Sequence, residues 1–110
     1  MTDEKSPIRM TPAFFFLMLA LTEGSRHGHA MAKDVKERSG GSVKLGPGSL
    51  YWSIGRLAEV GLIEEVDAPE DETDERRRFY GLTPFGVRVL ARETATLERI
   101  VDYARLRGVV

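Results

Sequence analysis

The fold is decided by residues 45–63, which read LGPGSLYWSIGRLAEVGLI. Gly46-Pro47 opens a helix, because proline suits the first helical position, and Gly61 ends it. Residues 62–63 then begin a strand. The sequence therefore predicts a helix over about 47–60 that is followed directly by a strand. Three apolar residues of this helix fall on one face: Leu50, Ile54 and Leu57.

A second helix is expected immediately before this one. Residues 27–38 carry an apolar stripe, and Ser39-Gly40-Gly41 breaks the helix. His27 is expected to close its first turn. Apolar and polar residues alternate over residues 42–45, which predicts a minor strand. The two helices have the layout of a helix-turn-helix pair.

The chain before this pair predicts a buried first helix. Thr11-Pro12 is a helix start, since threonine caps free amides and proline suits the first helical position. Residues 13–21 are apolar on nearly every face, which places the helix in the centre of the core or at a subunit interface. Gly24 is its expected stop. Residues 1–10 form an expected flexible N-terminal arm without the layout of a signal peptide.

A hairpin is expected after the helix-turn-helix pair. Residues 64–75 form a polar, acidic loop, and residues 76–82 are interpreted as the returning strand. Two strands joined by a loop at this place make a wing. The predicted fold is therefore mainly α with a small β-wing, a winged helix-turn-helix over residues 11–82.

A long helix is expected at the end of the chain. Thr83-Pro84 repeats the helix-start signal, and apolar residues then follow the alternating three- and four-residue steps of a coiled-coil seam to about Arg107. Because the winged helix is complete before this helix begins, we expect a partner chain to cover its apolar face. The alternative is that the helix folds back on its own core. Residues 83–110 are therefore expected to be a dimerisation helix. The expected interface residues are Phe14, Leu90, Leu97, Ile100, Val101 and Ala104.

Charge is unevenly distributed along the chain. Lys and Arg number 16 against 17 Asp and Glu, a formal net charge of −1. Eight of the acids lie in residues 64–75, which hold no base, so the rest of the chain has nine acids against all 16 bases. A basic patch is compatible with this distribution; the alternative is that a balanced surface only keeps the protein soluble.

Composition excludes several classes of protein. The chain has no cysteine, which excludes a disulfide framework and a thiolate zinc site. Its longest apolar run, residues 13–21, is far shorter than the about 20 residues that span a bilayer. A soluble, cytoplasmic protein is expected.

Four stretches match a known signature in order and spacing. They are residues 27–31 (HGHAM), residues 45–51 (LGPGSLY), the pair 56–57 (RL) with 61–63 (GLI), and residues 76–86 (RRRFYGLTPFG). Together they resemble the PadR family of transcriptional regulators, in particular its short subfamily with a single C-terminal helix. The resemblance covers the chain from about residue 11 onward. It implies a winged helix-turn-helix homodimer that represses transcription at a palindromic operator, often with relief by a small molecule.

A small hydrophobic effector is a further expected partner, because aromatic residues are dense in the first helix. Residues 14–16, all phenylalanine, and the paired C-terminal helices are the expected pocket, and the alternative is a closed, packed core. The chain departs from the family at His29, where tyrosine is usual, and at Gly81, where a polar or basic residue is usual. Its single tryptophan, Trp52, lies in the third helix, so stacking of flat drugs between tryptophans of the C-terminal helices is not expected.

The candidate DNA contacts follow from what DNA binding requires. The second helix of a helix-turn-helix reads base edges in the major groove with its N-terminal residues, and cationic groups hold the phosphates. Free amides at a helix start attract phosphate, and glycine lets the backbone approach closely. In a strand the side chains of the three wing arginines would point to alternate faces of the sheet, so only one or two of them would reach DNA. The candidates are Lys44, Gly48, Ser49, Tyr51, Trp52, Arg56, Arg76, Arg77 and Arg78.

Each of these candidates has a structural alternative. Tyr51 would pack the turn between the helices, Trp52 would pack in the core or an interface, and Arg56 would be a solvated charge. The wing arginines would form a salt-bridged surface with Asp74 and Glu75.

Other function classes find little support in the sequence. His27 and His29 do not share a helix face, and no further His or Cys completes a metal site. The chain lacks the nucleophile and base set of a hydrolase and the Lys-Ser/Thr ending of a phosphate-binding loop, so neither an enzyme nor a cofactor is expected. The alternative function is a winged helix used only for protein–protein contact, which would not need the arginines on one face.

Overall fold

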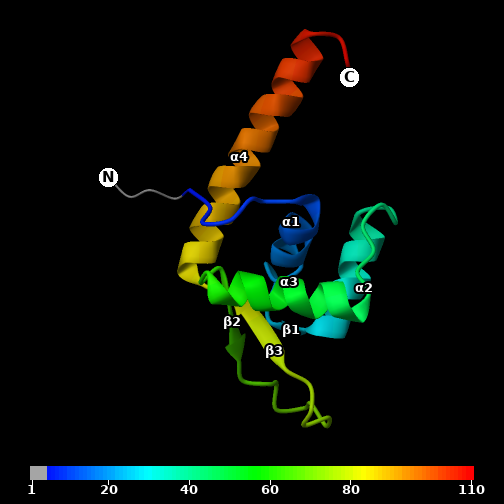
Figure 1. The fold of residues 1–110 in the computed structure, drawn as a ribbon, viewed down its shortest axis with the longest axis vertical. Helices are drawn as coiled ribbons and strands as arrows, with labels where there is room; N and C mark the ends of the chain where they lie inside the picture. The colour runs from blue at the N-terminus through cyan, green and yellow to red at the C-terminus, as the bar shows by residue number, and fades with distance from the viewer. Residues whose placement is uncertain (1–4) are drawn as a thin grey trace.

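Four helices and three short strands make up residues 5–110, the part of the chain that the computed structural model describes. Residues 1–4 of the expected N-terminal arm lie outside the described residues, and Ile8 and Met10 of that arm pack against the core. The expected winged helix-turn-helix is confirmed (Figure 1). The elements are α1 Pro12–Leu19, β1 Arg26–His27, α2 Gly28–Arg38, α3 Pro47–Glu59, β2 Ile63–Val66, β3 Phe79–Leu82 and α4 Pro84–Leu106.

Both Thr-Pro pairs start helices as predicted. The hydroxyl oxygen of Thr11 accepts a hydrogen bond from the Phe14 amide at 3.3 Å, and that of Thr83 accepts one from the Gly86 amide at 2.9 Å. The Thr83 hydroxyl also donates to the Gly61 carbonyl at 2.6 Å. The start of α4 is thereby tied to the chain that leaves α3.

The core lies where α1, α2, α3 and the base of the wing meet. α3 turns its predicted apolar face, which carries Leu50, into this core. α1 is less buried than expected: it ends at Leu19, whose side chain is 45% exposed. The largest fully buried side chains are Leu17, Met18, Met31, Val35, Leu57, Leu62, Ile63 and Val89.

The three strands form an antiparallel sheet in the order β1-β3-β2. In the wing hairpin Ile63 lies opposite Leu82, and Val66 lies opposite Phe79. On the other edge of β3, His27 of β1 also lies opposite Phe79. β1 therefore fastens the start of α2 to the wing.

Three expectations about the strands are wrong. Residues 42–45 form no strand, because the chain turns there and the Val43 amide donates to the Ser39 hydroxyl oxygen at 3.0 Å. The additional strand is β1 instead. Residues 64–66 belong to β2 and not to the acidic loop. β3 begins only at Phe79, so residues 76–78 lie before the strand rather than in it.

Hydrogen bonds at the end of the wing explain why β3 starts late. Asp74 Oδ1 accepts the Arg76 amide at 2.9 Å, and the Arg77 amide donates to the Asp74 carbonyl at 3.1 Å. An aspartate that binds the amide two residues further on is typical of a turn. The turn uses amides that a longer strand would have offered to its neighbour.

α4 begins on the core and then leads away from it (Figure 1). Val89 and Leu90 are buried, and Gly86 lies against the main chain of Leu62. The second half of α4 is largely exposed. Within residues 5–110, no helix combines the length and the apolar character that a membrane span needs.

Candidate nucleic-acid interface

The N-terminal end of α3 is open to solvent. Gly48 and Ser49 are exposed, and so is Lys44 in the segment that leads to the helix. Gly46 caps the helix without a side chain that would satisfy the first amides. These amides therefore remain available to an acceptor outside the chain.

Two aromatic side chains flank the exposed face of α3. Tyr51 leans toward α2, where a Cβ on Gly28 would lie 3.0 Å from its ring and 3.1 Å from its hydroxyl oxygen. Trp52 leans toward α1, and its ring stacks on that of Phe14 with 6.3 Å between the centroids. Tyr51 is nevertheless 54% exposed and Trp52 66%. Each side chain packs against a neighbouring helix, as the structural alternative expects, and also keeps an exposed surface; the predicted DNA contact stays a prediction.

Gly55 is a further candidate for the DNA-contacting surface that was not predicted from the sequence. It lies exposed inside α3, its φ is not positive, and a Cβ built on it would have no atom within 4 Å. Glycine inside a helix costs about 1 kcal/mol relative to alanine, and no contact in the described chain requires it here. The signal in the sequence is a glycine within an otherwise periodic helix.

Every arginine among the candidates is paired with a carboxylate of its own chain. The arginine side chains remain at least 40% exposed. The predicted partner Asp74 is one of the four acids, whereas Glu75 is not. The salt-bridged alternative is therefore realised on the wing. The nitrogen–oxygen distances are 2.6 Å for Arg56–Glu59, 3.3 Å for Arg76–Asp74, 3.2 Å for Arg77–Glu72 and 3.6 Å for Arg78–Glu65.

Hydrogen bonds lower the pKa of two wing carboxyl groups. The pKa of Glu72 lies below its ordinary value chiefly because the Asp74 amide donates to it, and the Arg77 guanidinium adds to the effect. The side-chain hydrogen bond from Arg76 lowers the pKa of Asp74. Both carboxyl groups are therefore ionised at neutral pH, and the two arginines face full negative charges.

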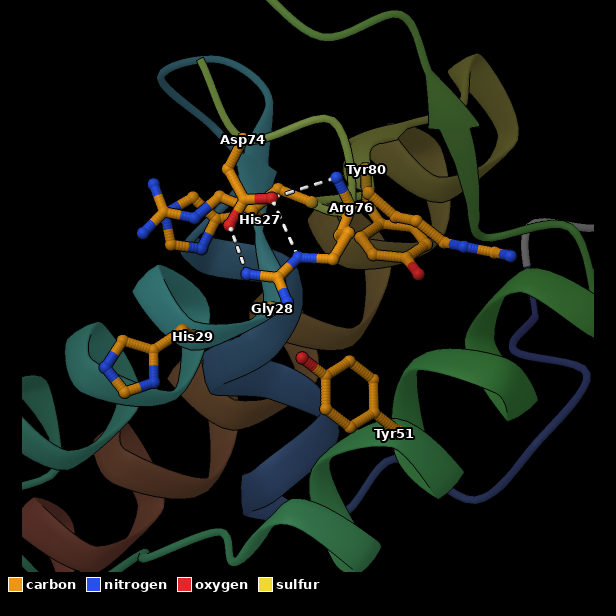
Figure 2. A pocket seen from close by; sticks show the side chains of 9 residues that line it. His27, Gly28, His29, Tyr51, Asp74, Arg76 and Tyr80 are labelled. Atoms are coloured by element: carbon orange, nitrogen blue, oxygen red, sulfur yellow. Dashed lines mark hydrogen bonds and ion pairs between the residues drawn. The ribbon is translucent and has the colours of Figure 1, made fainter. Parts of the chain in front are cut away.

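An open hollow of about 670 Å³ lies between the start of α2, the start of α3 and the wing. Figure 2 shows Tyr51 of α3 and Arg76 of the wing facing each other across it. The fold therefore brings these two sequence-distant candidates to one place. Ser49 and Trp52 border a separate groove beside α1. The residues that line the hollow are His27, Gly28, His29, Tyr51, Asp74, Arg76, Arg77, Arg78 and Tyr80.

His27 closes the start of α2 as predicted. Its Nδ1 accepts the Ala30 amide at 3.2 Å, and its ring packs edge-on against Phe79 with 5.5 Å between the centroids. Burial lowers the pKa of His27, and the positive charge of Arg77 lowers it further. Protonation of Nδ1 would place its N–H against the N–H of Ala30, and two donors cannot bond to each other. Only the neutral ring therefore caps the helix.

We expect acidification to weaken this cap. The folded pKa of His27 lies below the ordinary value of 6.5, so its contribution is complete above pH 6.5 and declines as the pH falls through the folded pKa. The expected loss is about 1 kcal/mol of the free energy of unfolding. Thermal unfolding of the wild type and of His27→Asn, measured between about pH 7.5 and pH 5, checks this, because asparagine caps without titrating. His29→Asn is the matched control, and equal pH responses of the wild type and His27→Asn would contradict the cap.

The second half of α4 carries most of the predicted interface residues. Leu97, Ile100 and Val101 are 44%, 58% and 42% exposed. Phe14 and Leu90 require a correction: they are only 7% and 6% exposed because they pack into the chain's own core. The expected effector pocket loses Phe14 for the same reason. Ala104, the remaining interface candidate, is half-buried.

The two histidines have ring centroids 6.5 Å apart. Within the described residues no group of three or more His, Asp or Glu side chains is placed to hold a metal ion.

Comparison with known proteins supports one family. The model of the transcriptional regulator PadR-like family matches residues 17–92. An uncharacterized 37.1 kDa protein in transposon TN4556 of Streptomyces fradiae is 33% identical over 93 residues, which are 84% of this chain and 25% of that protein. The chain thus spans about a quarter of the length of this curated relative.

Solved structures share the fold. A PadR family transcription regulator from Clostridium difficile superposes with a TM-score of 0.74 at 24% identity, over 87% of this chain and 97% of that chain. RosR from H. salinarum superposes with a TM-score of 0.64 at 26% identity, over 91% of this chain and 89% of that chain.

Proposed function

The chain belongs to the PadR-like family of transcriptional regulators, and on this premise we propose that it is a homodimeric, DNA-binding repressor. Proteins of this family are transcription regulators and not enzymes. The observation that carries the proposal is the hollow in which Tyr51 of α3 meets the wing arginines. Sequence-specific DNA binding needs a helix that contacts base edges and, beside it, cationic groups that bind phosphates.

α3 is the element that we place in the major groove, which is about 12 Å wide and admits a helix. Gly48 and Ser49 lead the helix in, and Gly55 lets the backbone come close to the DNA. Tyr51 and Trp52 contact the DNA from the two flanks of the helix. Arg56 and Lys44 contact the DNA phosphates.

The wing supplies further phosphate or minor-groove contacts through Arg76, Arg77 and Arg78. Because these residues lie before β3, the alternation of a strand does not limit how many of them reach DNA. Their exposed guanidinium groups are suited to phosphate.

Residues 11–82 form the DNA-binding part in this proposal, and residues 83–110 form the dimerisation helix. The exposed apolar side chains of α4, together with Ala104, would pair with those of a second copy: Leu97, Ile100 and Val101. The dimer would present two α3 helices about 34 Å apart to a palindromic operator. Occupation of that operator would repress transcription, and a small apolar effector bound between the α4 helices and residues 15–16 would relieve it.

An electrophoretic mobility shift on the DNA upstream of the chain's own gene, with excess non-specific competitor, tests the function. A discrete band that survives competition is expected. No shift on any DNA at low salt would instead favour a winged helix that contacts only proteins.

The double variant Arg77→Glu/Arg78→Glu is expected to bind this DNA far more weakly. Loss of two phosphate contacts corresponds to a roughly 60-fold weaker affinity at about 0.1 M salt. Fluorescence anisotropy with a labelled duplex measures the effect. Arg99→Glu/Arg105→Glu makes the same charge change on exposed positions of α4. Equal losses in the two variants would mean that the wing does not contact DNA.

A further inference from the structure

We propose that three wing carboxylates, Glu65, Glu72 and Asp74, restrain sequence-independent DNA binding. The inference rests on the proposed DNA-binding function and adds to it a group of residues that set its strength. Each carboxylate occupies a guanidinium group that a DNA phosphate would otherwise neutralise. The carboxylates are thus internal competitors of the phosphates.

Asp74 holds Arg76 by side-chain and main-chain contacts. Arg76 Nε and Nη2 lie 3.3 and 3.5 Å from the two carboxylate oxygens of Asp74, and the Arg76 amide donates to the same carboxylate (Figure 2). Such two-point contact is the geometry in which arginine also binds phosphate. A phosphate that binds Arg76 through this same Nε–Nη2 edge must therefore take the place of Asp74.

Glu72 is held in place by the main chain of the wing. Its Oε2 accepts the amides of Thr73 and Asp74 at 2.9 and 3.3 Å, and its side chain is only 13% exposed. Its Oε1 is left to accept from Arg77 at 3.2 Å. The fold of the wing therefore fixes the Glu72 carboxylate in the position from which it pairs with Arg77.

Pairing is selective within the acidic segment. Glu70 and Asp71 lie beside Glu72 in sequence and are exposed, yet neither has an ion pair in the structure of residues 5–110. The segment thus contains acids that compete directly for an arginine and acids that contribute only their charge. This difference allows direct competition to be separated from net charge.

The strength of the restraint is limited. The arginine side chains of these pairs are exposed, and such ion pairs change an equilibrium constant by at most about fivefold, so a phosphate can displace them. A phosphate that displaces a carboxylate forfeits that ion pair, so each pair weakens DNA binding by at most about fivefold. Removal of a paired carboxylate should therefore strengthen binding by an amount that is easily measured.

The experiment compares two charge-matched double variants of the full chain. Glu72→Gln/Asp74→Asn removes the paired carboxylates but keeps oxygens that accept the wing amides, and Glu70→Gln/Asp71→Asn removes the unpaired ones. Fluorescence anisotropy with a random-sequence duplex of about 30 base pairs, over a range of salt, gives affinity and slope. We expect the first variant to bind severalfold more tightly than the second, by up to about 25-fold for the two ion pairs removed.

Two results would overturn the inference while leaving DNA binding intact. Equal gains in both variants would show that only net charge matters, and weaker binding by Glu72→Gln/Asp74→Asn would show that the carboxylates position the arginines for DNA. A wild type that binds no DNA would overturn the proposed function and the inference together. If Glu72→Gln/Asp74→Asn unfolds the wing, Glu65→Gln repeats the test, because it frees Arg78 without removing a wing hydrogen bond. If Glu65→Gln then binds DNA no more tightly than Glu70→Gln, the inference is refuted.

Discussion

The Gly86→Ala variant is expected to lose about 3 kcal/mol or more of its free energy of unfolding. A Cβ at this position would lie 2.0 Å from the carbonyl oxygen of Leu62 and 2.9 Å from its carbonyl carbon. Non-bonded atoms normally approach to about 3.5–4.0 Å, and the obstacle here is main chain at a buried residue, which cannot rotate away. Overpacking costs about 1–3 kcal/mol in general, and more when the backbone must move.

Thermal unfolding followed by circular dichroism measures this loss. At about 4 °C or more per kcal/mol, the melting temperature should fall by about 12 °C or more. Gly55→Ala is the matched control, because it is the same substitution at an open helical position. It should raise the melting temperature by a few degrees, since alanine is favoured by about 1 kcal/mol in a helix. A Gly86→Ala variant as stable as the wild type would mean that α4 does not approach residue 62 as closely as the structure shows.

The double variant Leu97→Asp/Val101→Asp is expected to be a folded monomer. Both side chains are exposed in the single chain, so the core does not depend on them. In the proposed dimer the new carboxylates would lie between two α4 helices, and an unpaired buried charge costs several kcal/mol. Operator binding should weaken by about 100-fold or more, because two linked DNA-binding units gain that factor from acting together. Sedimentation equilibrium and anisotropy on the operator duplex measure the two effects.

The control for this variant places aspartates on the other side of the same helix. Ala95 and Leu106 are exposed and lie opposite Leu97 by the 3.6-residue turn of the helix. Ala95→Asp/Leu106→Asp should therefore keep the mass and the affinity of the wild type. A dimer that persists in Leu97→Asp/Val101→Asp would place the subunit contact elsewhere.

Much of the fold follows from local signals in the sequence. The Thr-Pro pairs place the starts of α1 and α4, because the capping hydroxyl and the proline act within one turn. The apolar period of α3 places its buried face, since that period alone decides which residues share a side. His27 as a cap was likewise predictable, because its partner Ala30 lies three residues away.

The strand errors have a different origin. β1 is too short to carry a periodic pattern, and it exists only because Arg26 and His27 pair with β3, which is distant in sequence. The wing arginines were expected in a strand, but Asp74 accepts the Arg76 amide with its side chain and the Arg77 amide with its carbonyl, which makes a turn. Local side-chain hydrogen bonds that compete with strand pairing are not visible in hydrophobic patterning.

The sequence by itself determined the order of the four helices and the wing hairpin, and the side of α3 that faces the core, because each of these has a signal within a few residues. Only the tertiary structure decided that Phe14 and Leu90 belong to the core and that Gly86 must be a glycine. It also decided that Tyr51 and the wing arginines share one hollow, with each arginine already held by a carboxylate. Such facts depend on distances between segments far apart in the chain, which are set by the packing of the whole domain and not by any local pattern.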